Sequence, residues 1–152
     1  MHYLEDYEIG KTHDLGGYEL SANEIITFGL QYDPQYYHID SDQAQHSLFG
    51  GLIASGWQVA AIWMKLYVTT MLMEAAVEGS PGVDELRWFQ SVRPSDSLYG
   101  TVTILRVTPS LSRQNCAILH KQGMLVNQHG EKVMQLILYS MFRKGSLNGD
   151  KQ

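Results

Sequence analysis

The segment from residue 52 to residue 77 constrains the fold of this chain most, because it is apolar along nearly its whole length. Read as a helix, it would run for about 40 Å. Apolar residues occupy every face of such a helix: Ile53, Trp57, Val59, Ala60, Ala61, Ile62, Trp63, Met64, Leu66, Val68, Leu72 and Ala76. A helix that is apolar all round either spans a membrane or is surrounded by protein.

Polar residues in this segment favour the second environment. Lys65 lies near its middle, Gln58 and Glu74 lie on either side of it, and no basic cluster flanks it. A membrane span of this length carries few charges and is usually bordered by basic residues. We therefore predict a core helix over residues 52–77.

Strand-like sequence follows a Gly-Ser-Pro-Gly break at residues 79–82. Four stretches rich in β-branched and aromatic residues are separated by turn sequences, and they cover residues 83–92, 98–107, 115–127 and 132–143. Residues 13–20 could add another strand. One apolar helix followed by hairpin-linked strands predicts an α+β fold in which an antiparallel sheet curls around the helix and buries it.

Length and charge narrow the class of protein. The 152 residues suit a single domain, which we place at residues 1–145, followed by a polar tail at 146–152 that we expect to be flexible. Apolar residues make up 44% of the chain, enough to fill a core. Eleven basic against sixteen acidic residues give a net charge of −5 with no basic run, which argues against binding nucleic acid.

Cysteine and histidine usage argues against structural cross-links. The lone Cys116 excludes an intrachain disulfide and a Cys-rich zinc site, and no two histidines have the spacing of metal ligands. We predict no metal. The first ten residues are acidic where a secretory signal would be basic and then apolar, so the expected compartment is the cytoplasm.

A helix and a loop precede the apolar segment. Ser21 and Glu24 have the spacing of a capping box, and the helix they open should end near Tyr32, because Pro34 disfavours helical geometry at Asp33. We predict a loop over residues 33–38 and then a short helical stretch around residues 42–47.

Four segments carry a family resemblance. Residues 33–38 read Asp-Pro-Gln-Tyr-Tyr-His and residues 49–56 read Phe-Gly-Gly-Leu-Ile-Ala-Ser-Gly. Residues 92–96 (Val-Arg-Pro-Ser-Asp) and 127–133 (Asn-Gln-His-Gly-Glu-Lys-Val) follow in order. From about residue 8 to residue 143 the chain resembles the MaoC-like dehydratases and (R)-specific enoyl-CoA hydratases. The resemblance implies a hot-dog fold, in which a long central helix is wrapped by a curved antiparallel sheet.

The resemblance also implies an activity. Such proteins add or remove water across the C2–C3 bond of an enoyl or 3-hydroxyacyl thioester, in fatty acid metabolism. It implies Asp33 and His38 as the acid–base pair and the Gly56 amide in the oxyanion hole. Coenzyme A enters as part of the substrate, or an acyl carrier takes its place, and no other cofactor is implied. The family's site lies at a dimer interface, and open edge strands independently favour a homodimer or a multiple of one.

The residue types suit this chemistry. Hydration needs a base for the attacking water, a proton for C2 and stabilisation of the carbonyl oxygen, and a carboxylate and an imidazole that share one water supply the first two. Asp33 and His38 lie in a stretch braced by Pro34, which can fold both side chains to one point. The alternative is that Asp33 caps a turn and His38 is an ordinary loop residue. Unpaired amides near Gly56 could bind the oxygen, or the glycine could serve packing alone.

Departures from the family pattern leave the activity open. Gln35 stands where the hydratases usually have Asn, Tyr36 where they have Pro, Ser55 where many have His, and Ala61 where some have Ser. The candidate substrate-binding residues are Gln35, Tyr37, Gly51, Ser55 and Trp57. Two alternatives therefore stand beside the hydratase: a hot-dog thioesterase, whose carboxylate would direct water at the carbonyl, and an acyl-thioester-binding module without turnover.

Overall fold

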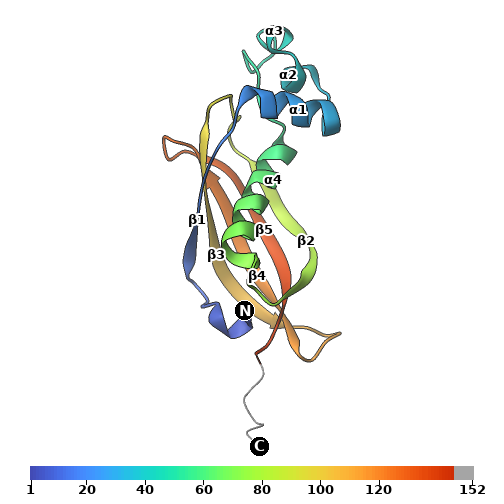
Figure 1. The fold of residues 1–152 in the computed structure, drawn as a ribbon, viewed down its shortest axis with the longest axis vertical. Helices are drawn as coiled ribbons and strands as arrows, with labels where there is room; N and C mark the ends of the chain where they lie inside the picture. Colours follow the sequence, from blue (N-terminus) through green and yellow to red (C-terminus); the bar gives the residue numbers. More distant parts are fainter. Residues whose placement is uncertain (146–152) are drawn as a thin grey trace, which may run out of the picture.

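A computed structural model describes residues 1–145 as a five-stranded antiparallel sheet curved around one helix, with further helices at one end (Figure 1). The central helix is α4 (Gly56–Tyr67). The strands are β1 (Thr12–Glu19), β2 (Val77–Trp88), β3 (Ser97–Pro109), β4 (Cys116–Val126) and β5 (Lys132–Arg143), in the order β1-β3-β4-β5-β2. The predicted hot-dog α+β fold is confirmed. The predicted tail at 146–152 lies outside the described residues.

The central helix is shorter than predicted at both ends. Ser55 caps α4 by accepting the Trp57 amide at 3.3 Å, so residues 52–55 precede the helix. These residues are extended because their amides pair elsewhere: Ile53 N–H donates to the Tyr37 carbonyl at 3.0 Å and Ala54 N–H to the Val92 carbonyl at 2.8 Å. At the other end, α4 continues as a π-helical turn, Val68–Leu72. The prediction of one helix over 52–77 was therefore wrong at its boundaries.

One side of α4 forms the core of the domain. Its core side chains are buried against the sheet: Val59, Ile62, Trp63, Leu66 and Tyr67. The Trp63 indole lies on Gly123 of β4, where a Cβ would come within 2.4 Å of the ring, and its Nε1–H donates to the Thr101 carbonyl at 3.0 Å. The opposite side is open: Trp57 is 61% exposed and Met64 is 36% exposed in the single chain.

The strand predictions differ from the structure mainly at β2. The predicted strands at 13–20, 98–107, 115–127 and 132–143 correspond to β1, β3, β4 and β5. β2 begins six residues earlier than predicted and ends at Trp88, because the break at 79–82 is absorbed by shifts of its register against β5. Such bulges, and Pro81, are tolerated because β2 is an edge strand.

Three helices at one end of the sheet sit over the beginning of α4 (Figure 1): α1 (Ala22–Tyr32), α2 (Tyr36–Ile39) and α3 (Ser41–Ala44). The capping box is confirmed, since Ser21 and Glu24 exchange hydrogen bonds of 2.9 and 3.2 Å. The loop prediction for 33–38 was partly wrong, because Tyr36–Ile39 forms the helical turn α2. None of the helices in residues 1–145 is long and apolar enough to cross a membrane.

Candidate active site

A pocket of about 430 Å³ opens where α1 and α2 meet the beginning of α4 and the end of β2. Its lining is largely apolar and aromatic around one carboxylate and one imidazole. The lining residues are Asp33, Gln35, Tyr37, His38, Phe49, Ile53, Ala54, Gly56, Trp57, Val59, Trp88, Phe89, Gln90, Ser91 and Val92. Three predicted catalytic residues and three of the five predicted substrate-binding residues therefore lie around one cavity.

The local fold brings Asp33 and His38 together. The Asp33 amide donates to the Gly29 carbonyl at 2.9 Å and ends α1, while the His38 amide donates to the Gln35 carbonyl at 2.9 Å and closes the turn of α2. Pro34 lies between the two helices. This sharp turn folds the chain back, so that His38 Nε2 lies 3.3 Å from Asp33 Oδ2. A straight strand would have placed the two side chains on opposite faces.

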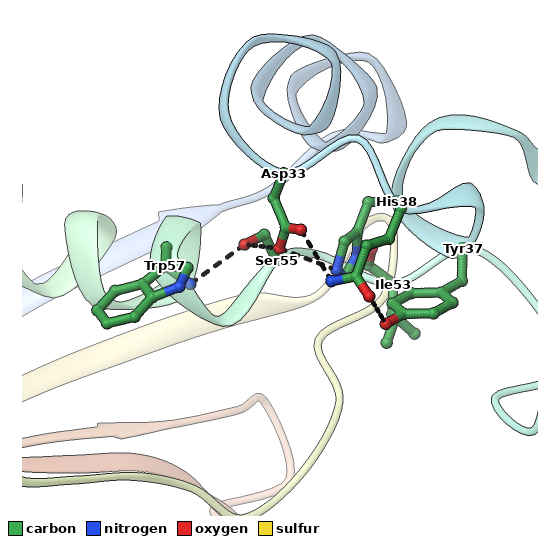
Figure 2. Close-up of polar contacts among 7 residues, drawn as sticks. Asp33, Tyr37, His38, Ile53, Ser55 and Trp57 are labelled. Atoms are coloured by element: carbon green, nitrogen blue, oxygen red, sulfur yellow. Dashed lines mark hydrogen bonds and ion pairs between the residues drawn. The ribbon is translucent and has the colours of Figure 1, made fainter.

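The backbone of Ile53 orients the His38 ring (Figure 2). His38 is 4% exposed, and its Nδ1 lies 2.7 Å from the Ile53 carbonyl oxygen. Because a carbonyl can only accept, Nδ1 carries the proton in the neutral ring and Nε2 presents its lone pair to Asp33. The lone pair and the carboxylate oxygen are both acceptors, so the pair favours either a proton shared between them or an O–H donor that reaches both atoms from the pocket side.

Asp33 accepts hydrogen bonds at both carboxylate oxygens. Ser55 Oγ donates to Oδ2 at 2.7 Å and Gln35 Nε2 donates to Oδ1 at 2.8 Å. The Tyr37 hydroxyl in turn donates to Gln35 Oε1 (Figure 2). Burial raises the pKa of Asp33, but the hydrogen bonds from Ser55 and Gln35 and the charge of His38 together bring that pKa below its usual value. Asp33 is therefore held as a carboxylate.

Gly56 is the first residue of α4 and lines the pocket. Within residues 1–145 its amide has no hydrogen-bond acceptor, as expected at a helix N-terminus, so it can bind an incoming oxygen. A Cβ at this position would lie 2.6 Å from the Trp88 ring. The structure thus shows an unpaired amide and close packing at this glycine, while its binding of a carbonyl oxygen stays a prediction.

Two predicted substrate-binding residues do not line the pocket. Ser55 is 0% exposed and its hydroxyl is engaged by Asp33 and the Trp57 amide. Gly51 lies instead beside Arg93, whose Nη1 would be 3.3 Å from a Cβ there. Trp57 does line the pocket, in an edge-to-face contact with Trp88 at 5.4 Å between ring centroids.

Sequence reasoning missed several pocket residues. Trp88 ends β2 and Phe89 follows it, and they meet Gly56 and Trp57 of α4 only in the folded chain, so their alternation alone did not indicate a pocket wall. The aromatic pair at a strand end was the available signal. Ile53 contributes its carbonyl group, a role that no side-chain pattern reveals. Within residues 1–145 no group of three or more His, Cys, Asp or Glu residues could hold a metal ion.

A helix that packs one face against a curved antiparallel sheet is the hot-dog architecture. The chain belongs to the MaoC-like family, because the model of the MaoC like domain matches residues 6–119.

Similar proteins extend over nearly the whole chain. A MaoC-like dehydratase from Rhodospirillum rubrum is 39% identical, has a TM-score of 0.87 and is aligned over 97% of this chain and 100% of its own. The uncharacterized protein YdeM of Bacillus subtilis is 29% identical over 132 residues, which is 87% of this chain and 92% of YdeM. The (R)-hydratase PhaJ1 from Pseudomonas aeruginosa shares the fold, with a TM-score of 0.76 at 19% identity over 94% of this chain and 86% of its own.

Proposed function

We propose that this protein is a hydro-lyase that adds water to, or removes it from, the C2–C3 bond of an enoyl or 3-hydroxyacyl thioester. The observation that carries the proposal is the 3.3 Å approach of His38 Nε2 and Asp33 Oδ2 in a pocket that also contains the Gly56 amide. An acid–base pair and an oxyanion donor are the groups that this reaction needs.

In the proposed hydration, a water in the pocket lies beside the dyad and hydrogen-bonds to both the Asp33 carboxylate and His38 Nε2. Its oxygen bonds to C3 while one of its protons passes to a member of the dyad, and the electrons of the C2–C3 double bond move towards the thioester carbonyl. The Gly56 amide donates a hydrogen bond to the oxygen that becomes enolate-like. The proton then passes from the dyad to C2 on the same face, which restores the carbonyl and gives the 3-hydroxyacyl thioester.

The lining supports an acyl thioester as the substrate. Ile53, Ala54, Val59 and Val92 are buried and apolar, and they suit a hydrocarbon chain. We propose that coenzyme A or an acyl carrier protein supplies the thiol. The (R)-hydratases among the structural neighbours support this substrate class by their shared fold.

We also propose that the working unit is a homodimer. The open side of α4 exposes Trp57 and Met64, and the edge strand β2 exposes Val83 and Trp88. An unpaired edge beside exposed large apolar side chains favours association with a second copy. Trp57 and Trp88 also line the pocket, so this association would place the site near the interface.

A panel of acyl-CoA substrates tests the activity. With a short trans-2-enoyl-CoA, we expect loss of enoyl absorbance without release of free thiol, and the Asp33→Asn variant should lose this reaction. Thiol release from saturated and unsaturated acyl-CoAs alike would instead identify a thioesterase. Binding of the ligand by calorimetry with neither reaction would identify a binding module and overturn the proposal.

A further inference from the structure

Two side chains donate to the Asp33 carboxylate. Gln35 Nε2 reaches back to Oδ1 at 2.8 Å. The Ser55 hydroxyl reaches Oδ2 at 2.7 Å. The two contacts engage different oxygens of the carboxylate, one from the turn before α2 and one from the cap of α4.

Both donors are engaged in contacts within the protein. The one hydroxyl proton of Ser55 is used by Asp33, its oxygen accepts the Trp57 amide at 3.3 Å, and the residue is fully buried. The amide oxygen of Gln35 accepts the Tyr37 hydroxyl, and this contact fixes which end of the amide faces Asp33. The residues therefore form a clamp, defined here as Ser55 and Gln35 acting on Asp33.

The clamp makes the two members of the dyad unequal. Asp33 already accepts two neutral donors, and its carboxylate is stabilised as an anion. The Ile53 carbonyl fixes His38 Nδ1. In the neutral ring the Nε2 lone pair therefore lies beside Asp33 Oδ2 and is free to accept a proton from a bound water. Tyr37 also contacts this pair, with its ring 4.6 Å from the His38 ring.

We infer that Ser55 and Gln35 are positioning residues that hold Asp33 as a fixed hydrogen-bond acceptor, so that His38 Nε2 takes the proton from water and returns it to C2. This inference rests on the proposed function for the identity of the water reaction. The role of the clamp on Asp33 can be measured without any turnover.

The first experiment follows the Asp33 carboxyl carbon by NMR during a pH titration, with Asp33→Asn to assign the signal. Removing a donor destabilises the anion, so Ser55→Ala and Gln35→Ala should each move the Asp33 midpoint upward, and Ser55→Thr should keep it near the wild-type position. Gln35 is exposed, so its variant is expected to fold even if Ser55→Ala does not. Unchanged midpoints in both alanine variants would overturn the clamp.

Two matched controls separate the clamp from general effects. Ser21→Ala also removes a serine helix cap, that of α1, and Gln43→Ala also removes a glutamine amide bound to an aspartate, that of Asp40 at 3.0 Å. Neither residue touches Asp33 or lines the pocket. Both variants should leave the midpoint of the Asp33 titration unchanged. A shift in either would mean that loss of protein stability, and not loss of the clamp, moves this midpoint.

The second experiment uses the pH dependence of hydration. The acid limb of kcat/KM should follow the protonation of the His38 ring, and not that of the Asp33 carboxylate, when both are measured by NMR. Gln35→Ala should lower kcat by less than about tenfold, since it removes a positioning contact and no proton carrier. An acid limb that follows Asp33 instead would overturn the assignment of His38 as the base. An inactive wild type with a shifted Asp33 midpoint would refute the proposed reaction but leave the clamp intact.

Discussion

A buried lysine outside the pocket gives a test of the core. Lys121 on β4 is 0% exposed, and its ammonium group lies between the rings of Tyr67 and Phe142, at 5.5 and 5.4 Å from their centroids. Its one hydrogen bond goes to the Leu119 carbonyl at 3.3 Å, and within residues 1–145 no carboxylate pairs with it. Burial lowers the pKa of Lys121 from 10.5 to about 7.

The sign of the effect on stability follows from this shift. The folded state binds the proton less tightly than the unfolded state, so the protein loses stability as the pH falls from about 10.5 towards 7 and the penalty is complete below 7. One pKa unit corresponds to about 1.4 kcal/mol, so the slope is at most about 1.4 kcal/mol per pH unit and the full penalty is about 5 kcal/mol. Lys121→Met keeps the length of the side chain and removes this charge.

Urea unfolding at fixed protein concentration checks the calculation between pH 6 and pH 9.5. At pH 6 the Lys121→Met variant should have a free energy of unfolding several kcal/mol above the wild type, and the difference should shrink as the pH rises. Lys11→Met, at an exposed lysine, is the control and should run parallel to the wild type. If the free energy of unfolding of Lys121→Met also ran parallel to that of the wild type across this pH range, the assignment of a buried, destabilised ammonium group would be refuted.

Three further predictions concern the site and the assembly. Asp33→Asn and His38→Ala should each lower the rate of hydration at least a hundredfold. The double variant should be little slower than the slower single variant, because the two groups act on one water. Additive losses in steady-state kinetics would contradict the dyad. Gly56→Ala should lower kcat/KM at least tenfold, because its Cβ would lie 2.6 Å from the Trp88 ring and displace the pocket wall. Adding Trp88→Ala should restore part of the loss, and a fully active Gly56→Ala would argue against the close contact. Light scattering should give the mass of a dimer or a multiple of it, and a monomer at working concentration would refute the proposed interface.

Local sequence patterns determined most of the secondary structure. The capping box at Ser21 and the proline at residue 34 fixed both ends of α1, because caps and prolines act within one helical turn. β5 follows its predicted limits because a hairpin turn precedes it and its residues are mostly apolar, with buried and partly buried positions alternating along most of its length. The spacing of Asp33 and His38 is likewise local, and a turn and one short helix suffice to bring them together.

Long-range pairing decided what the patterns could not. The segment 52–55 is apolar enough for a helix, but hydrogen bonds to Tyr37 and Val92 hold it extended and move the start of α4 to Gly56. The apolar residues on every face of α4 indicated that the helix is buried, but they did not indicate which part of the protein covers each face. In the structure the sheet covers one side and leaves Trp57 exposed. The contacts that define the site have the same origin: the Ile53 carbonyl and the Ser55 hydroxyl reach His38 and Asp33 from 15 and 22 residues away. The periodicity of the sequence indicates which face of a helix or strand is apolar. Which segment packs against that face is determined only by the folding of the whole chain.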